Sequence, residues 1–254
     1  MVQYFAMPRY DFRSPRLYLD ATLSEGGTIA LDKAQANYLL NVLRLSAGDG
    51  VLVFNGRDGE WQASVARAGK RDAALVLGMR TRQQTAAADL HYLFAPLKQA
   101  RLDYMVQKAV ELGASRLQPV LTRHTQVARV NLDRMRANAI EACEQCGVLA
   151  LPDIVEPLTL ERALGVCEPE RVLVFCDEAA DVKDPVAALG AVAVGRPLAV
   201  LIGPEGGFAE DERALLLRRP DVVRLALGPR ILRADTAAVA ALSLVQAVLG
   251  DWRA

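Results

Sequence analysis

Residues 198–207 read LAVLIGPEGG, an apolar run that ends in a glycine-rich turn. A short apolar run bounded by a turn is typical of a strand that is buried on both faces of a parallel sheet. Three glycines within residues 203–207 let the backbone turn sharply and approach a ligand closely. We therefore predict a buried strand at 198–202, a functional loop at its carboxyl end, and a helix that then runs to Leu217.

A second loop of this kind follows the next apolar run. Residues 222–227, VVRLAL, predict a strand, and GPRILR at 228–233 follows it. Ligands of open parallel sheets bind beyond the carboxyl ends of the strands. Two such loops, at what we take to be adjacent strand ends, therefore favour one shared ligand site. Asp177 and Glu178, after a predicted strand at 172–176, mark a third and weaker strand end. A single glycine-rich loop would fit a plain turn into the following helix equally well.

The rest of the chain divides into two patterns. Residues 90–254 alternate strands with helices, which is typical of an α/β domain with a mostly parallel sheet. Residues 1–80 contain short predicted strands, separated by glycine turns, and one helix that Asp32 can cap. These features predict a small β-barrel. The polar stretch TRQQTAAAD at 81–89 predicts a linker between the two domains.

The loops argue against two common ligand classes. Neither contains the phosphate-binding P-loop pattern or the dinucleotide fingerprint, which disfavours a nicotinamide-dependent oxidoreductase. Glu205 lies in the first loop, and an acidic triplet opens the helix behind it at 210–212. Carboxylates repel phosphate but suit a cationic reactive centre, such as the sulfonium of S-adenosylmethionine.

The overall charge excludes a protein that coats nucleic acid indiscriminately. The chain carries 30 basic and 30 acidic residues, so its formal net charge is zero. The charges are nevertheless segregated, because residues 98–136 hold eight basic and only three acidic side chains. A selective RNA contact is therefore compatible with the sequence, and we name Arg80, Arg82 and Arg129 as candidates for it.

The sequence does not support a membrane protein, a secreted protein or a zinc protein. No apolar run reaches the about 18 residues of a membrane helix, and no secretory signal precedes Met7, an alternative start. We therefore expect a cytoplasmic protein with no membrane partner. Cys143 and Cys146 form a C-x2-C pair, but no second pair completes a zinc site. We expect reduced thiols and no metal, with metal or redox chemistry at this pair as the alternative.

Several stretches resemble the ribosomal RNA small-subunit methyltransferase E family, whose members methylate N3 of a uridine in 16S rRNA. They span nearly the whole chain: PRYDF at 8–12, LLNVLRLSAGD at 39–49, QKAVELGA at 107–114, EACEQCG at 141–147, GPEGGF at 203–208 and LGPRILRADTA at 227–237. The resemblance implies a PUA-like β-barrel followed by a SPOUT α/β methyltransferase domain with a C-terminal trefoil knot. It also implies a homodimer that acts on 16S rRNA or on the assembled small ribosomal subunit.

The resemblance also implies a cofactor site for S-adenosylmethionine, held mainly by backbone groups. Its residues are Leu201, Ile202, Gly203, Glu205, Gly206, Leu227, Gly228, Ile231, Leu232 and Arg233, with Thr236 nearby. The sequence departs from the family at Ala234 and Asp235, where Thr-Glu is usual, and at Val148, where an arginine-containing stretch is usual.

Catalysis at N3 requires that a weakly acidic proton be removed or shared. We name Arg233, which would orient the base or a phosphate, and Asp235, which would handle the proton, with Glu205 as the other carboxylate for that task. The alternative roles are a helix cap for Asp235 and an ion pair of Arg233 with Asp235 or Glu205. Arg9, in the PRYDF stretch, is a candidate RNA contact. His124 is more consistent with loop structure than with catalysis.

Two other functions remain open on the sequence alone. One is an RNA-binding protein that kept the fold without activity, and the intact glycine-rich loops argue against it. The other is ribose 2′-O-methylation, which other SPOUT enzymes perform.

Overall fold

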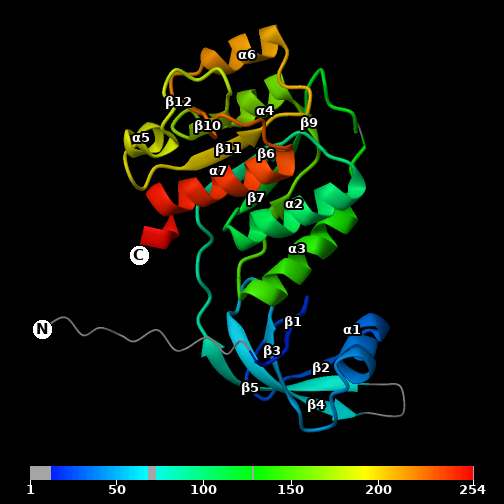
Figure 1. The fold of residues 1–254 in the computed structure, drawn as a ribbon. Helices are drawn as coiled ribbons and strands as arrows, with labels where there is room; N and C mark the ends of the chain where they lie inside the picture. Colours follow the sequence, from blue (N-terminus) through cyan, green and yellow to red (C-terminus); the bar gives the residue numbers. More distant parts are fainter. Residues whose placement is uncertain (1–12, 68–72, 128, 254) are drawn as a thin grey trace, which may run out of the picture. The chain divides into compact units, whose positions relative to one another are not determined.

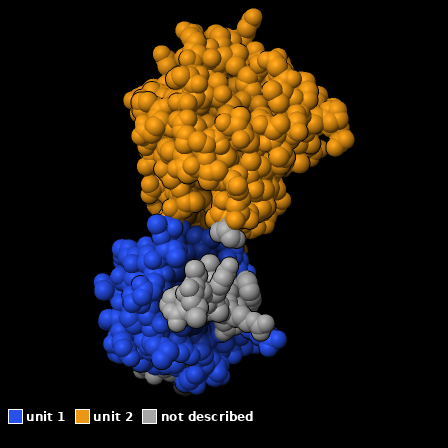
Figure 2. All heavy atoms as spheres, turned by 90° about the vertical axis from the view of Figure 1, so that its left-hand side faces the viewer, with its two compact units in different colours: residues 1–86, 143–150 blue, residues 87–142, 151–254 orange. Residues whose placement is uncertain are grey.

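The computed structural model describes residues 13–67, 73–127 and 129–253. The chain forms two compact units, which Figure 2 colours separately. Unit 1 comprises Met1–Ala86 and Cys143–Ala150, and unit 2 comprises Ala87–Ala142 and Leu151–Ala254. The stretch that begins at Cys143 is therefore grouped with the N-terminal part of the chain, although the helix that contains its first residues begins in unit 2.

Unit 1 is built on one five-stranded sheet (Figure 1). Its order is β1-β3-β4-β5-β2. Only the β1–β3 pair is parallel, and the other pairs are antiparallel. The strands are β1 (Arg16–Tyr18), β2 (Thr28–Ala30), β3 (Gly50–Phe54), β4 (Glu60–Arg67) and β5 (Ala73–Arg82). The short strands separated by glycine turns that the sequence predicts for this part of the chain are therefore present.

The predicted helix of unit 1 begins as expected. Asp32 caps α1 (Lys33–Asn37) by accepting a hydrogen bond from the Gln35 N–H, and Gln35 completes a capping box. The chain continues as the π-helical turn η1 (Tyr38–Val42), which buries Leu39 in the core of the unit.

The predicted linker begins too early at Thr81. Strand β5 continues through Thr81 to Arg82, and Arg82 pairs with Glu60 of β4. The polar composition of this stretch misled the prediction, because an exposed strand end needs backbone hydrogen bonds rather than apolar side chains.

A buried ion pair anchors the EACEQCG stretch within unit 1. Arg16 Nε lies 2.9 Å from Glu60 Oε2, and both side chains are only 2% exposed. The Arg16 guanidinium also donates to the backbone carbonyls of Cys143, Glu144 and Val148. Because the acceptors are backbone carbonyls, these contacts depend on where the backbone lies and not on the type of side chain. The role of this stretch in unit 1 is therefore structural, and Val148 provides its contact through its backbone.

Unit 2 is built on a seven-stranded sheet in which every pair is parallel. The order is β12-β10-β11-β6-β7-β8, and β9 also pairs with β7. The strands are β6 (Leu90–Phe94), β7 (Arg116–Leu121), β8 (Asp153–Ile154), β9 (Leu158–Thr159), β10 (Val172–Cys176), β11 (Leu198–Ile202) and β12 (Val222–Leu225). The prediction of an α/β domain with a mostly parallel sheet is confirmed.

Helices cover both faces of this sheet (Figure 1). They are α2 (Gln99–Glu111), α3 (Leu132–Cys146), α4 (Leu160–Val166), α5 (Pro185–Gly190), α6 (Glu210–Leu217) and α7 (Ala234–Val248), with a final 3₁₀ turn, η2 (Asp251–Arg253). Helices α4 and α6 pack with Phe175 and Leu201 on one face. On the other face α2 packs against α7, and the buried Tyr92 donates to the sulfur of Met105 in α2. Among the described residues, no helix is long and apolar enough to span a bilayer.

The strand order corrects one expectation. Strands β11 and β12 are not neighbours, because β10 lies between them and pairs with both. The loop at Asp177 and Glu178, which we treated as the weakest of the three, is therefore the central one. Since the strands are parallel, all three loops lie at the carboxyl edge of the sheet.

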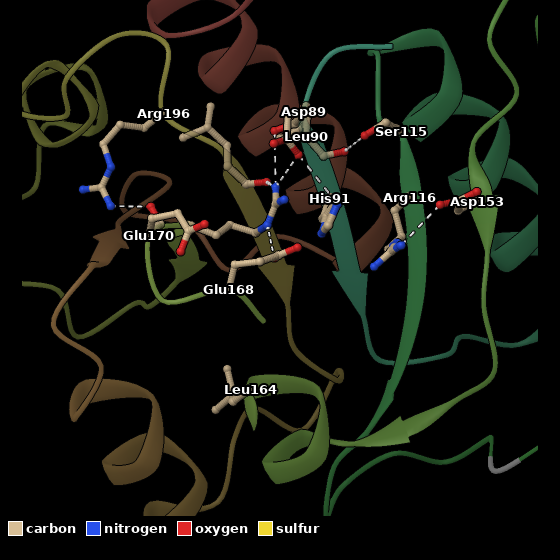
Figure 3. A network of polar contacts seen from close by, with 12 residues as sticks. Asp89, Leu90, His91, Ser115, Arg116, Asp153, Leu164, Glu168, Glu170 and Arg196 are labelled. Carbon is tan, nitrogen blue, oxygen red and sulfur yellow. Dashed lines mark hydrogen bonds and ion pairs between the residues drawn. The ribbon is translucent and has the colours of Figure 1, made fainter. Parts of the chain in front are cut away.

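A polar network closes the opposite, amino edge of the sheet (Figure 3). Arg171, just before β10, lies 2.7 Å from Asp89 and donates to the Leu198 carbonyl at the start of β11. Glu168 accepts from Arg171 Nε at 2.8 Å, and this hydrogen bond lowers the pKa of Glu168 to about 2. These contacts tie the starts of three strands together.

Candidate functional site

A cavity of about 850 Å³ lies beyond the carboxyl ends of β10, β11 and β12. It is lined by the three loops that follow these strands and by the start of α7. Most of the predicted cofactor residues line it: Ile202, Gly203, Glu205, Gly206, Leu227, Gly228, Ile231, Leu232 and Arg233. The structure thus brings together two loops that are separate in the sequence.

Two predicted cofactor residues do not line the cavity. The Leu201 side chain is fully buried in the core with α4 and α6, because neighbouring residues of a strand point to opposite faces. Thr236 is exposed on the first turn of α7. Neither side chain reaches the cavity, so any contribution from Leu201 would come through its backbone.

The loop after β11 is held by close packing. A Cβ atom at Gly203 would lie 2.8 Å from the Phe208 ring, so no larger residue fits there without displacing that ring. A Cβ at Gly206 would lie 3.3 Å from the Cβ of His124. His124 Nδ1 lies 3.0 Å from the carbonyl oxygen of Gly207, and since a carbonyl only accepts, Nδ1–H donates. This contact is the structural role that the sequence favoured for His124.

The loop after β10 contributes a buried carboxylate. Asp177 accepts hydrogen bonds from Arg213 Nη2 at 2.9 Å and Arg224 Nε at 2.8 Å. Burial alone would raise the pKa of Asp177, but these two hydrogen bonds outweigh it, so the pKa lies below its ordinary value. Sequence reasoning missed Arg213 and Arg224. A lone arginine inside the apolar run VVRLAL was the available signal for the second.

The charges that line the cavity are balanced. Its carboxylates are Asp177, Glu178 and Glu205, and its guanidinium groups are Arg213, Arg230 and Arg233. Apolar side chains at the strand ends, such as Ile202 and Leu225, complete the wall. This lining suits a ligand that combines an apolar part with charges of both signs, and it does not suit a highly charged anion.

The two candidate catalytic residues lie at the start of α7. Arg233 lines the cavity, whereas Asp235 is not part of its lining. Asp235 Oδ1 accepts from the Thr236 N–H at 2.9 Å. The N-cap of α7 is Arg233, and no side chain of the described residues caps this end, so the helix-cap alternative for Asp235 is wrong. Neither alternative ion pair of Arg233 forms among the described residues: Glu205 pairs with Arg101, and Asp235 accepts from the Thr236 N–H without an ion pair to Arg233.

The candidate RNA contacts are distributed over both units. Arg80 is exposed on β5, with its guanidinium 5.9 Å from the centre of the Trp61 ring. Arg82 is partly buried and donates to Glu60 and to the Gly147 carbonyl. Arg129 is exposed in the connection between β7 and α3 of unit 2. Arg9 and the rest of the PRYDF stretch lie outside the described residues.

The cysteines are free thiols. Burial raises the pKa of Cys143 and of Cys176 to about 12, so both are protonated at neutral pH. Within the described part of the chain, no group of three or more His, Cys, Asp or Glu side chains is placed to hold a metal ion.

Comparison with known protein families matches both units. Residues 84–246 match a family described as an RNA methyltransferase domain, and residues 31–77 match one described as an RNA methyltransferase PUA domain. The chain is 30% identical to the ribosomal RNA small subunit methyltransferase E of Rickettsia conorii, over 91% of this chain and 94% of that protein. It is 31% identical to the protein of the same name from Synechocystis, over 87% and 74%.

Solved structures agree with this match. The structure of a ribosomal RNA small subunit methyltransferase E from Neisseria gonorrhoeae bound to S-adenosylmethionine has a TM-score of 0.84 and 28% identity, over 94% of this chain and all of that one. A putative methyltransferase from Legionella pneumophila, in complex with the same cofactor, has a TM-score of 0.81 and 28% identity, over 94% and 99%.

Proposed function

Because the chain belongs to the ribosomal RNA small subunit methyltransferase E family, we propose that it transfers the methyl group of S-adenosylmethionine to N3 of a uridine in 16S rRNA. The observation that carries this proposal is the cavity in which both family motifs meet at the carboxyl edge of a parallel sheet. A 16S rRNA substrate implies action in the cytoplasm, where ribosomes are assembled.

The residues of the cavity fit the cofactor. S-Adenosylmethionine combines an apolar adenine with an amino acid of both charges and a sulfonium, and the lining is apolar in part and balanced in charge. The tight packing at Gly203 and Gly206 keeps the loop backbone beside the ligand. When bound, the cofactor supplies an electrophilic methyl group on a sulfonium.

The chain itself then has to hold the uracil and take its N3 proton. We assign the first task to Arg233, whose guanidinium lines the cavity and has no ion pair among the described residues. We assign the second to Asp235, whose Oδ1 accepts from the Thr236 N–H while Oδ2 has no hydrogen bond among the described residues.

Methyl transfer to unmodified 16S rRNA and to small ribosomal subunits tests the function. Mass spectrometry of the product nucleosides should find N3-methyluridine, and a 2′-O-methyl nucleoside would instead support the ribose alternative. Binding of S-adenosylmethionine, measured by calorimetry, separates an enzyme from an inactive RNA-binding relative.

Two variants test the catalytic assignments. Asp235→Asn keeps an acceptor for the Thr236 N–H but has little affinity for a proton, so its kcat should fall by about 10²-fold or more. Arg233→Ala should lower kcat/KM. If both retain wild-type rates with unchanged cofactor binding, the assignments are wrong.

The remaining family features are also proposals. We propose a C-terminal trefoil knot and a homodimer, and light scattering of the purified protein would test the homodimer. We further propose that Arg80, Arg82 and Arg129, together with Arg9, contact RNA. Charge reversal at Arg80 or Arg129 should weaken RNA binding and reduce its salt dependence. Arg82 is a poorer test, because its reversal also removes two structural hydrogen bonds.

A further inference from the structure

A second, smaller cavity of about 260 Å³ borders the first within unit 2. The two cavities share Pro204 and Glu205 of the glycine-rich loop as a common wall. Besides Glu205, the polar side chains that line the smaller cavity are Lys98, Arg101, His124 and Gln126. None of these four belongs to the predicted cofactor or catalytic residues.

We propose that this smaller cavity holds a backbone phosphate of the RNA beside the nucleotide to be methylated. The assignment rests on the proposed function, since it takes the neighbouring cavity as the cofactor site. It names a part of the substrate and the residues that bind it, rather than another reaction.

The charges of the smaller cavity favour an anion. Lys98 and Arg101 are its cations, and Glu205 is its one carboxylate. Glu205 is already paired with Arg101, so it does not repel a bound phosphate as a free carboxylate would. Lys98 is exposed, and its ammonium has no acceptor among the described residues. The lining therefore retains one uncompensated positive charge, in contrast to the balanced lining of the larger cavity.

The local backbone adds to this preference. Lys98 is the N-cap of α2, a helix of 13 residues, and no side chain caps this end. Lys98 and Ala100 both line the cavity, so the first turn of the helix borders it. The N–H groups and the positive dipole end of a helix stabilise a neighbouring anion. This feature reinforces the charged lining, which alone carries the assignment.

The shared wall places the two ligands side by side. A phosphate held by Lys98 would lie across Pro204–Glu205 from the cofactor cavity. A nucleotide must leave its stack to reach a buried methyl donor, and a fixed phosphate next to it limits the positions that the base can take. Lys98 is thus a substrate-binding residue that positions the RNA.

Lys98 variants test the assignment with an unmodified 16S rRNA transcript as the probe. Lys98→Ala should weaken RNA binding about 5- to 20-fold and lower the slope of log K against log salt by about 0.7–0.9, the value of one phosphate contact. Lys98→Glu should weaken RNA binding further, and Lys98→Arg should restore the wild-type RNA affinity. KM for RNA should rise while kcat at saturating RNA is kept.

Arg218→Glu is the matched control. Arg218 is exposed at the far end of α6, and among the described residues its side chain donates only to the Ala214 carbonyl of its own helix. Its reversal should leave both RNA affinity and salt slope close to wild type. If Lys98→Ala and Lys98→Glu also bind RNA like wild type, or if Lys98→Ala weakens S-adenosylmethionine binding as strongly as RNA binding, the assignment is wrong.

Failure of the proposed function would look different. A wild-type protein that binds RNA and S-adenosylmethionine but forms no N3-methyluridine contradicts the reaction. The RNA affinities of the Lys98 variants would still decide whether the smaller cavity binds phosphate.

Discussion

His124 donates a hydrogen bond from Nδ1 to the carbonyl oxygen of Gly207 over 3.0 Å, although the two residues are 83 positions apart. The contact joins the turn after β7 to the glycine-rich loop after β11. A Cβ at Gly206 would lie 3.3 Å from the Cβ of the same histidine, so His124 lies close to the loop at two consecutive positions. The loop that forms the wall between the two cavities is therefore held from the end of β7, two strands away in the sheet, as well as from its own strand.

Removal of this support should weaken cofactor binding. His124→Ala loses one hydrogen bond, worth about 1 kcal/mol, so we expect the Kd for S-adenosylmethionine to rise about fivefold in calorimetry. His124→Gln can still donate to the carbonyl and should show a smaller effect. Equal affinity in His124→Ala and wild type would show that the loop holds its shape without the histidine.

Gly203→Ala should disturb the same loop through packing. The new Cβ would lie 2.8 Å from the Phe208 ring, and this ring is itself held edge-on against the buried Phe175. We expect destabilisation of about 1–3 kcal/mol and weaker cofactor binding. Gly165→Ala, where a Cβ meets nothing within 4 Å, is the control and should cost nothing in urea denaturation. A Gly203→Ala protein as stable as this control would contradict the packing argument.

Asp177→Ala should destabilise unit 2 and weaken cofactor binding together. It leaves Arg213 and Arg224 without the carboxylate that orders the central loop, and the Asp177 side chain is only 5% exposed. We expect a loss of about 2–3 kcal/mol, because hydrogen bonds to charged groups are among the stronger ones. Asp181 also pairs with Arg224 but is 90% exposed, so Asp181→Ala should change stability by less than about 1 kcal/mol. Similar losses in both variants would show that burial is unimportant here.

Arg16→Ala should destabilise unit 1 by about 3–5 kcal/mol, because it leaves Glu60 buried with a weaker partner and three backbone carbonyls without their donor. Arg57→Ala is the control, since its pair with Asp20 is exposed on both sides and should contribute little. The double variant Arg16→Met/Glu60→Leu should recover part of the loss in guanidinium denaturation. No recovery would show that the lost contacts to the backbone carbonyls, rather than the lost ion pair, account for most of the destabilisation.

The stability of unit 2 should fall between pH 7 and pH 5 because of His91. Burial, aided by Arg171 and Arg116, lowers the pKa of His91 to about 4 from its ordinary 6.5. Between these values the unfolded chain binds more protons than the folded one, so the unfolding free energy decreases as the pH falls. We expect a loss of about 2 kcal/mol between pH 7 and pH 5.

The His91→Gln variant checks this origin. This variant should reduce the difference in unfolding free energy between pH 7 and pH 5 by about 2 kcal/mol. The chain has only one other histidine, the exposed His124. An unchanged difference in His91→Gln would assign the pH dependence to other groups.

Local patterns in the sequence were sufficient for most elements of this fold, but the short elements β8, β9, α4 and α5 were not predicted. The apolar run at 198–202, the Asp32 cap and the glycine turns of unit 1 each depend on neighbours within a few residues. For the same reason the loops at Gly203–Gly207 and Gly228–Arg233 were each recognisable as a turn at a strand end. The prediction that they form one site assumed neighbouring strands, although β10 lies between β11 and β12. The end of β5 was misjudged, since a strand whose residues are exposed shows no apolar signal.

Contacts between distant segments were decided only by the tertiary structure. The order β12-β10-β11 made Asp177 the centre of the site, and nothing near Asp177 in the sequence indicates Arg213 or Arg224 as its partners. The pairing of Glu205 with Arg101, and hence the charge of the smaller cavity, arises in the same way. Periodicity and turn chemistry act within a few residues, whereas the strand order and the charge pairing of the cavities depend on packing across the whole sheet. The sequence by itself therefore determined the longer strands and helices and the loop motifs, and the folded chain decided which of their side chains meet.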